Sequence, residues 1–133
     1  MTTLTRRTGL IAASLLAATA LGTAAFAQTA EINIGISLST TGPAAALGIP
    51  EKNSIDFVPK EIGGVKLNLI VLDDAGDPTA ATTNARRMVS ENKVDILVGS
   101  SITPTGIAMG NVATETGVPH FSLAPMPMPP EKA

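Results

Sequence analysis

Four short apolar segments alternate with helical patterns from residue 31 onward, and this alternation limits the possible folds more than any other feature. In the first segment, EINIGISL, isoleucine or leucine occupies every second position, as in a β-strand. Short apolar strands that alternate with helices are typical of parallel sheets covered on both faces. The order predicts an α/β fold, a partial doubly wound parallel sheet of about four strands with helices on both faces. The expected strands cover residues 31–38, 65–73, 94–98 and 118–123.

Prolines and glycines mark the expected ends of the helices. Pro50 is expected close to a helix start, because proline suits the first helical turn. Asp77-Pro78 and Thr103-Pro104 each have the pattern of a capping residue followed by the first helical residue. Gly117 favours a left-handed helix stop. Three helices are therefore expected, from about residue 50, over 78–92 and over 104–115.

The N-terminus has the pattern of a cleavable export signal. Arg6 and Arg7 precede an uncharged apolar run over 9–22, which is too short to cross a bilayer, and Ala25-Phe26-Ala27 supplies the small residues of a cleavage site. We therefore expect a signal peptide over 1–27 and a mature domain over 28–124. Residues 125–133 contain four prolines and are expected to form a disordered tail.

The composition of the remaining chain argues against several classes of partner. The two arginines are the only charges of residues 1–27, so the net charge falls from −2 for the whole chain to −4 without them. This acidic balance offers no basic patch for nucleic acid or for an anionic membrane. The chain has no cysteine, which excludes disulfides, a thiolate nucleophile and cysteine-bound zinc.

Polar loops follow the predicted strands, and ligands of parallel sheets bind outside the carboxyl ends of the strands. Ser100, Ser101 and Thr103 crowd the start of a predicted helix, where free N–H groups and the helix dipole favour an anion such as a carboxylate. The alternative is plain capping by Thr103. Thr40 and Thr41 lie in a similar loop, whose alternative is a turn with capping.

Acidic and histidine residues give little indication of catalysis. Asp73 and Asp74 end a strand and could bind a metal or accept a phosphoryl group. We favour a solvated strand end, in which Asp74 or Asp77 accepts hydrogen bonds from loop N–H groups. His120 is the only histidine, and a structural role is expected for it. Without cysteine or a nucleophile elbow, the sequence predicts no enzyme and no metal site.

Three stretches together resemble a known family, the Leu/Ile/Val-binding branch of the periplasmic substrate-binding proteins of ABC transporters, which have the type I periplasmic binding fold. The stretches are INIGISLSTTGPAAALGIPEKNSI, VKLNLIVLDDAGDPTAATTNARRMVSENKVDILVGSSITP and VPHFSLA. Their order and spacing carry the resemblance, which covers residues 30–124.

The resemblance implies a two-lobed periplasmic protein that closes on a small solute and delivers it to a membrane permease, without a cofactor. Its ligands are amino acids or other small carboxylates, including aromatic acids. Serines and Thr103 of the 99–103 loop are implied to hold the ligand carboxylate, with further contacts near residue 123 and rim contacts near residue 40. The implied ligand residues are Ser100, Ser101, Thr103, Ser122, Ala124, Thr40 and Thr41.

Members of this family are much longer than 133 residues, so we expect this chain to be an N-terminal fragment that binds weakly or not at all. The fragment holds the first part of one lobe, and the cause of the short frame stays open between a natural truncation and a frameshift. Two other functions are considered. One is a flavodoxin-like phosphoacceptor or enzyme domain that uses Asp73 or Asp74. The other is a stand-alone periplasmic sensor or interaction domain.

Overall fold

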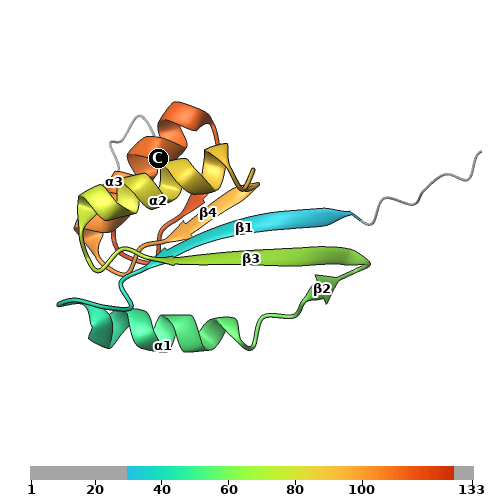
Figure 1. Cartoon of the computed structure of the whole chain (residues 1–133), viewed down its shortest axis with the longest axis horizontal. Coiled ribbons are helices and arrows are strands. Elements are labelled where there is room, and N and C mark those ends of the chain that lie inside the picture. Colours follow the sequence, from blue (N-terminus) through green and yellow to red (C-terminus); the bar gives the residue numbers. More distant parts are fainter. Residues whose placement is uncertain (1–29, 128–133) are drawn as a thin grey trace, which may run out of the picture.

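A computed structural model describes residues 30–127, which form one layer of strands between helices (Figure 1). The predicted signal peptide and most of the predicted tail lie outside the described residues. Within residues 30–127, no helix is long and apolar enough to cross a membrane. The elements are β1 (Glu31–Leu38), α1 (Ala45–Ile55), β2 (Glu61–Ile62), β3 (Val65–Asp73), α2 (Pro78–Ser90), β4 (Ile96–Gly99), α3 (Thr103–Thr116) and β5 (His120–Phe121).

The sheet has the order β2-β3-β1-β4-β5, with β1 at its centre. The four predicted strands all pair in parallel: β1 with β3 and β4, and β4 with β5. Helix α1 covers one face, whereas α2 and α3 cover the other (Figure 1). The predicted α/β class is therefore confirmed. The sheet is mixed, however, because β2 adds a fifth strand that pairs antiparallel with β3.

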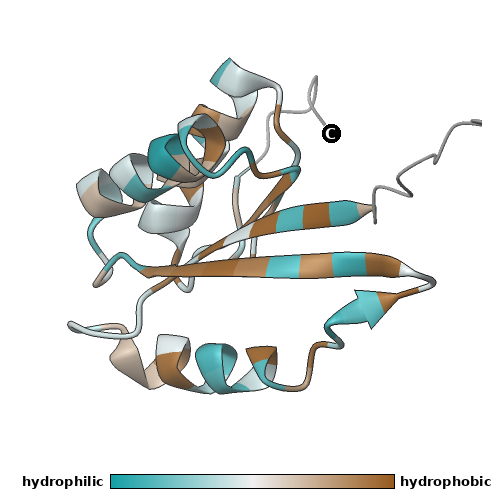
Figure 2. Ribbon diagram, turned by 45° about the vertical axis from the view of Figure 1, so that its right-hand side comes forward, coloured by the Kyte–Doolittle hydropathy of each residue, from teal (hydrophilic) through white to brown (hydrophobic). Residues whose placement is uncertain are grey.

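The core lies between the sheet and the two helices α2 and α3. Met88, Leu97, Met109 and Val112 are almost fully buried there, and each such side chain contributes about 1.5–3 kcal/mol through its burial. In α2 the buried residues are apolar and recur at helical spacing, as predicted. Hydrophobic and hydrophilic residues alternate along β1 (Figure 2). The core is aliphatic, since the side chain of Phe57 is 87% exposed.

Several predicted boundaries are wrong. Helix α1 begins at Ala45, one turn and more before Pro50, which lies inside it. Proline has no N–H, so the carbonyl one turn before Pro50 has no helical donor. Helix α3 is capped by Ile102 rather than Thr103, and among residues 30–127 no side chain accepts a hydrogen bond from the N–H groups of its first turn. Gly117 ends α3 in a left-handed conformation with φ of 74°, as predicted.

Helix α1 lies very close to the end of β1, and Gly48 makes this approach possible. A Cβ atom built on Gly48 would lie 2.1 Å from the carbonyl oxygen of Ser39 and 2.9 Å from the amide nitrogen of Thr40. Both distances are shorter than any real Cβ contact, so only glycine fits here. This contact fixes α1 against the loop that follows β1.

Candidate functional site at the carboxyl edge of the sheet

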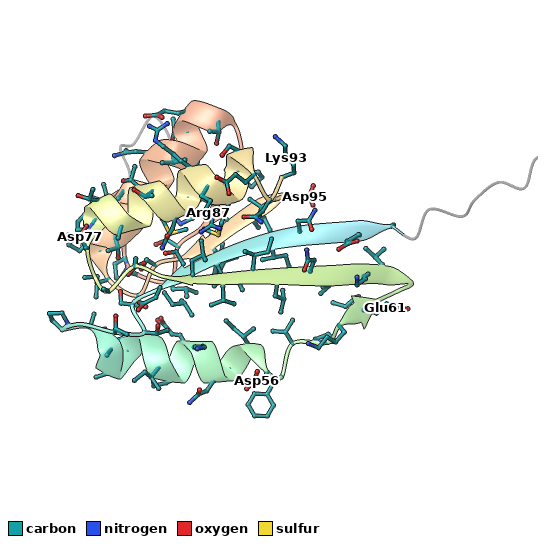
Figure 3. All side chains as sticks on the ribbon, in the orientation of Figure 1. Asp56, Glu61, Asp77, Arg87, Lys93 and Asp95 are labelled. Carbon is teal, nitrogen blue, oxygen red and sulfur yellow. The ribbon has the colours of Figure 1, made fainter. Side chains whose placement is uncertain are left out.

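The carboxyl ends of β1, β3 and β4 meet at one edge of the sheet, where α2 begins (Figure 1). Asp77, the N-cap of α2, marks this edge in Figure 3, and Glu61 and Asp95 lie toward the opposite end. The side chain of Asp77 accepts a hydrogen bond from the amide of Ala80 at 2.8 Å, as the capping pattern predicts. The loops that could meet a ligand are thus gathered on one side.

Asp74 is the centre of a buried polar network at this edge. Its two carboxylate oxygens accept hydrogen bonds from the hydroxyls of Ser37 (2.8 Å), Ser39 (2.7 Å) and Ser100 (2.6 Å) and from the amide of Gly76 (3.0 Å). The residue is fully buried, so the prediction of a solvated strand end is wrong for Asp74. The prediction that Asp74 accepts from a loop N–H is correct.

Asp73 is exposed and organises the loop after β1. Its carboxylate accepts from the amides of Thr40 (2.9 Å), Thr41 (3.2 Å) and Ala75 (2.9 Å) and from the hydroxyl of Thr41 (2.6 Å). Desolvation of the carboxyl acts to raise its pKa, but these four hydrogen bonds outweigh it and lower the pKa of Asp73 to about 2. Both threonines predicted as rim contacts are therefore held by Asp73.

The depressed pKa of Asp73 predicts a loss of stability in acid. The folded pKa lies below that of the unfolded chain, so the stabilisation is complete above about pH 4 and is lost as the pH falls toward 2. Because the carboxylate is exposed, the loss is below about 1 kcal/mol. We expect Thr41→Val to raise the pKa of Asp73, measured by NMR titration of the carboxyl carbon. Thr83→Val in α2 is the control, and an equal pKa in both variants would contradict the role of Thr41.

Ser100 and Ser101 both use their hydroxyl protons within the protein. Ser100 donates to Asp74, and its oxygen accepts from the amide of Ser101 at 2.6 Å. The hydroxyl of Ser101 donates to a carboxylate oxygen of Glu51 from α1, and its oxygen accepts from the amide of Ser39 at 3.0 Å. The two predicted serines are thus in the same network as the end of β1.

A second group of predicted residues joins the start of α3 to the segment after β5. The hydroxyl of Thr103 donates to the carbonyl of Pro125 at 2.9 Å, and the hydroxyl of Ser122 donates to the carbonyl of Ala124 at 2.7 Å. Thr103 therefore does not cap α3 through its side chain, so the capping alternative is wrong. Along the chain, the start of α3 lies between the loop that contains Ser100 and Ser101, here called the serine loop, and the Ser122 segment.

Sequence reasoning missed Ser37, Ser39 and Glu51 as members of the site. Ser37 and Ser39 are two positions apart along one chain segment, so a strand period alone places them on the same side of β1. That signal was available in the sequence. No sequence signal pointed to Glu51, because its contact with Ser101 depends on how α1 packs on the sheet.

His120 makes a structural contact with the last residue of β4. Its Nε2 atom lies 2.5 Å from the carbonyl oxygen of Gly99, while Nδ1 is buried without a hydrogen-bond partner in the described part of the chain. Burial lowers the pKa of His120, and the contact with Gly99 partly offsets this. His120 lines a cavity of about 590 Å³ beside α3, together with Gly110 and Met126. None of the seven predicted ligand residues lines that cavity.

A mostly parallel sheet with polar loops beyond its carboxyl edge is the architecture of a small-molecule-binding α/β domain. A family model described as "Periplasmic binding protein" matches residues 31–132, and the chain belongs to this family. The resemblance found in the sequence is thereby confirmed. The relatives compared below are named as binding proteins and receptors rather than enzymes.

Three relatives illustrate the likeness. A Leu/Ile/Val-binding protein homolog 7 from Brucella abortus (strain 2308) is 34% identical over 81% of this chain and 28% of its own length. An extracellular ligand-binding receptor from Rhodopseudomonas palustris is 61% identical, with a TM-score of 0.76, over 79% of this chain and 29% of that one. An ABC transporter solute binding protein from Rhodopseudomonas palustris BisB5, solved in complex with 3,4-dihydroxy benzoic acid, is 28% identical with a TM-score of 0.66, over 71% of this chain and 27% of that one. The chain thus spans less than a third of the length of these relatives.

Proposed function

We propose that this chain is the first-lobe part of the solute-binding subunit of an ABC importer, exported to the periplasm by residues 1–27. The observation that carries this proposal is the uncapped start of α3, which lies between the serine loop and the Ser122 segment at the carboxyl edge. First-turn N–H groups without a side-chain partner bind carboxylates well. Membership of the periplasmic binding protein family supports the same function. In the whole protein, a permease would receive the solute.

The proposed ligands are small carboxylates, either amino acids or aromatic acids. The names of the relatives support both classes, since one is a Leu/Ile/Val-binding homolog and another was solved with 3,4-dihydroxy benzoic acid. Binding needs no catalysis, and we propose no cofactor. The proposed ligand contacts are those implied by the sequence, namely Ser100, Ser101, Thr103, Ser122, Ala124, Thr40 and Thr41.

Titration of the purified protein with leucine and with 3,4-dihydroxybenzoate tests this function. One lobe encloses less than the roughly 70–90% of ligand surface that a closed cleft buries, so we expect weak but measurable binding, with dissociation constants of about a millimolar. In ¹H–¹⁵N NMR spectra, the amides of Ser101, Thr103 and Thr105 should shift on titration. Shifts confined to the cavity beside His120 would contradict the proposed site, and micromolar affinity would contradict the expected weakness.

A further inference from the structure

Glu51 is a half-buried carboxylate at the carboxyl edge of the sheet whose hydrogen-bonding capacity is mostly unused, whereas Asp77, which also accepts one hydrogen bond, is exposed there. An ionised carboxylate has about four acceptor positions. Asp73 and Asp74 each accept four hydrogen bonds, whereas Glu51 accepts one, from the hydroxyl of Ser101, in the described part of the chain. Glu51 is half-buried, and none of the three ion pairs among residues 30–127 involves it.

The contact between Glu51 and Ser101 determines which ligand group this position can accept. A serine hydroxyl has one proton, and Ser101 donates it to Glu51. A ligand carboxylate could bond to that hydroxyl only after displacing Glu51, and it would then lie beside a second negative charge. An ammonium or a hydroxyl of the ligand, in contrast, could donate to Glu51 while the bond from Ser101 stays intact.

The geometry points to Glu51 as a specificity-determining residue that binds a hydrogen-bond donor of the ligand, an ammonium or a hydroxyl, and that disfavours ligands with a carboxylate alone. This inference rests on the proposed function. It gives the carboxylate-binding role to the start of α3 and the donor-binding role to Glu51 from α1. The two groups approach the same edge from opposite faces of the sheet, since α1 and α3 cover different faces (Figure 1).

Three probe molecules test the inference on the purified protein by NMR titration. Leucine carries an ammonium, 3,4-dihydroxybenzoate carries phenolic hydroxyls, and benzoate carries a carboxylate and no other donor. The variants are Glu51→Gln and Glu61→Gln. Glu61 lies in β2 toward the opposite end of the sheet (Figure 3), so its substitution removes the same charge without changing the edge.

We expect Glu51→Gln to tighten binding of benzoate relative to leucine by about five- to tenfold, because a screened like charge is removed and a charge-assisted bond is lost. Glu61→Gln should leave the ratio unchanged. If only the affinity ratio of leucine to benzoate changes, the group that donates to Glu51 is an ammonium. If only the ratio of 3,4-dihydroxybenzoate to benzoate changes, that group is a hydroxyl. Either result supports Glu51 as the residue that accepts from the ligand.

Equal effects of Glu51→Gln on all three probes, or the same ratio change in Glu61→Gln, would overturn the inference and leave the proposed function intact. Absence of binding by every protein to every probe would overturn the proposed function, and the inference with it. The two failures are therefore distinguishable. A Glu51→Gln variant that no longer folds would show a collapsed NMR spectrum, and Glu51→Asp, which keeps the charge, then replaces it and should keep the wild-type preference.

Discussion

Replacing Asp74 by alanine is expected to destabilise the domain by about 3–5 kcal/mol, because the change leaves three buried serine hydroxyls without their acceptor. Each unsatisfied buried group costs about 1–3 kcal/mol, and some of the three can pair again with one another. Small domains are stable by only about 5–15 kcal/mol, so the substitution should remove a large share of the free energy of unfolding and lower the urea midpoint clearly. Urea denaturation followed by far-ultraviolet circular dichroism measures the loss.

The control for this prediction is Asp56→Ala, which removes the same carboxylate from an exposed position at the end of α1. Its effect should stay within about 0.5 kcal/mol, as for most surface substitutions. Asp74→Asn retains one acceptor oxygen and should fall between the two. A loss below about 1 kcal/mol in Asp74→Ala would show that the network contributes little to folding.

Replacing Gly48 by alanine is expected to destabilise the protein by about 2 kcal/mol or more. The new methyl group would lie 2.1 Å from the carbonyl oxygen of Ser39, which belongs to the backbone and cannot turn away. Overpacking of this kind costs about 1–3 kcal/mol or more and exceeds the gain of up to about 1 kcal/mol in helix propensity. The shift of α1 should also separate Glu51 from Ser101, which NMR chemical shifts at both residues would report.

Gly110→Ala in α3 is the matched control, since it makes the same change inside another helix. The added Cβ atom would meet its nearest neighbour, Nδ1 of His120, at 3.5 Å, an ordinary contact distance. Helix propensity then favours alanine, and the variant should be as stable as the wild type or up to about 1 kcal/mol more stable. Equal urea midpoints for the Gly48 and Gly110 variants would contradict the close approach of α1.

The strands and α2 could be predicted from the sequence because their patterns are local. Alternation over residues 31–38 and the Asp77-Pro78 start of α2 follow from neighbouring residues alone. β2 and the start of α1 could not be predicted in the same way. β2 has two residues, too few for a period, and α1 contains a proline that ordinarily marks a helix start. Tertiary packing therefore determines β2 without a local signal, and it determines the start of α1 against the local signal.

The candidate edge could be predicted, but its network could not. Strand ends and serine-rich loops are visible in the sequence. The register of the strands is not visible in the sequence. In the structure, the register pairs Ser37 with Leu72 of β3 and with Gly99 of β4, which brings the ends of three strands together around Asp74. Burial of Asp74 follows from this arrangement. The contact between Glu51 and Ser101 likewise joins residues 50 positions apart, which no short pattern relates.

Under the proposed function, the network around Asp74 has a consequence for the entropy of ligand capture. Because one carboxylate holds the ends of β1, β3 and β4, the loops that follow these strands are ordered before a solute arrives. A solute that binds here does not have to immobilise them itself, and ordering a side chain at an interface costs about 0.5–1.5 kcal/mol. The conformational cost at this edge is thus met during folding, and the affinity for the proposed solute would depend on the contacts that the solute itself makes.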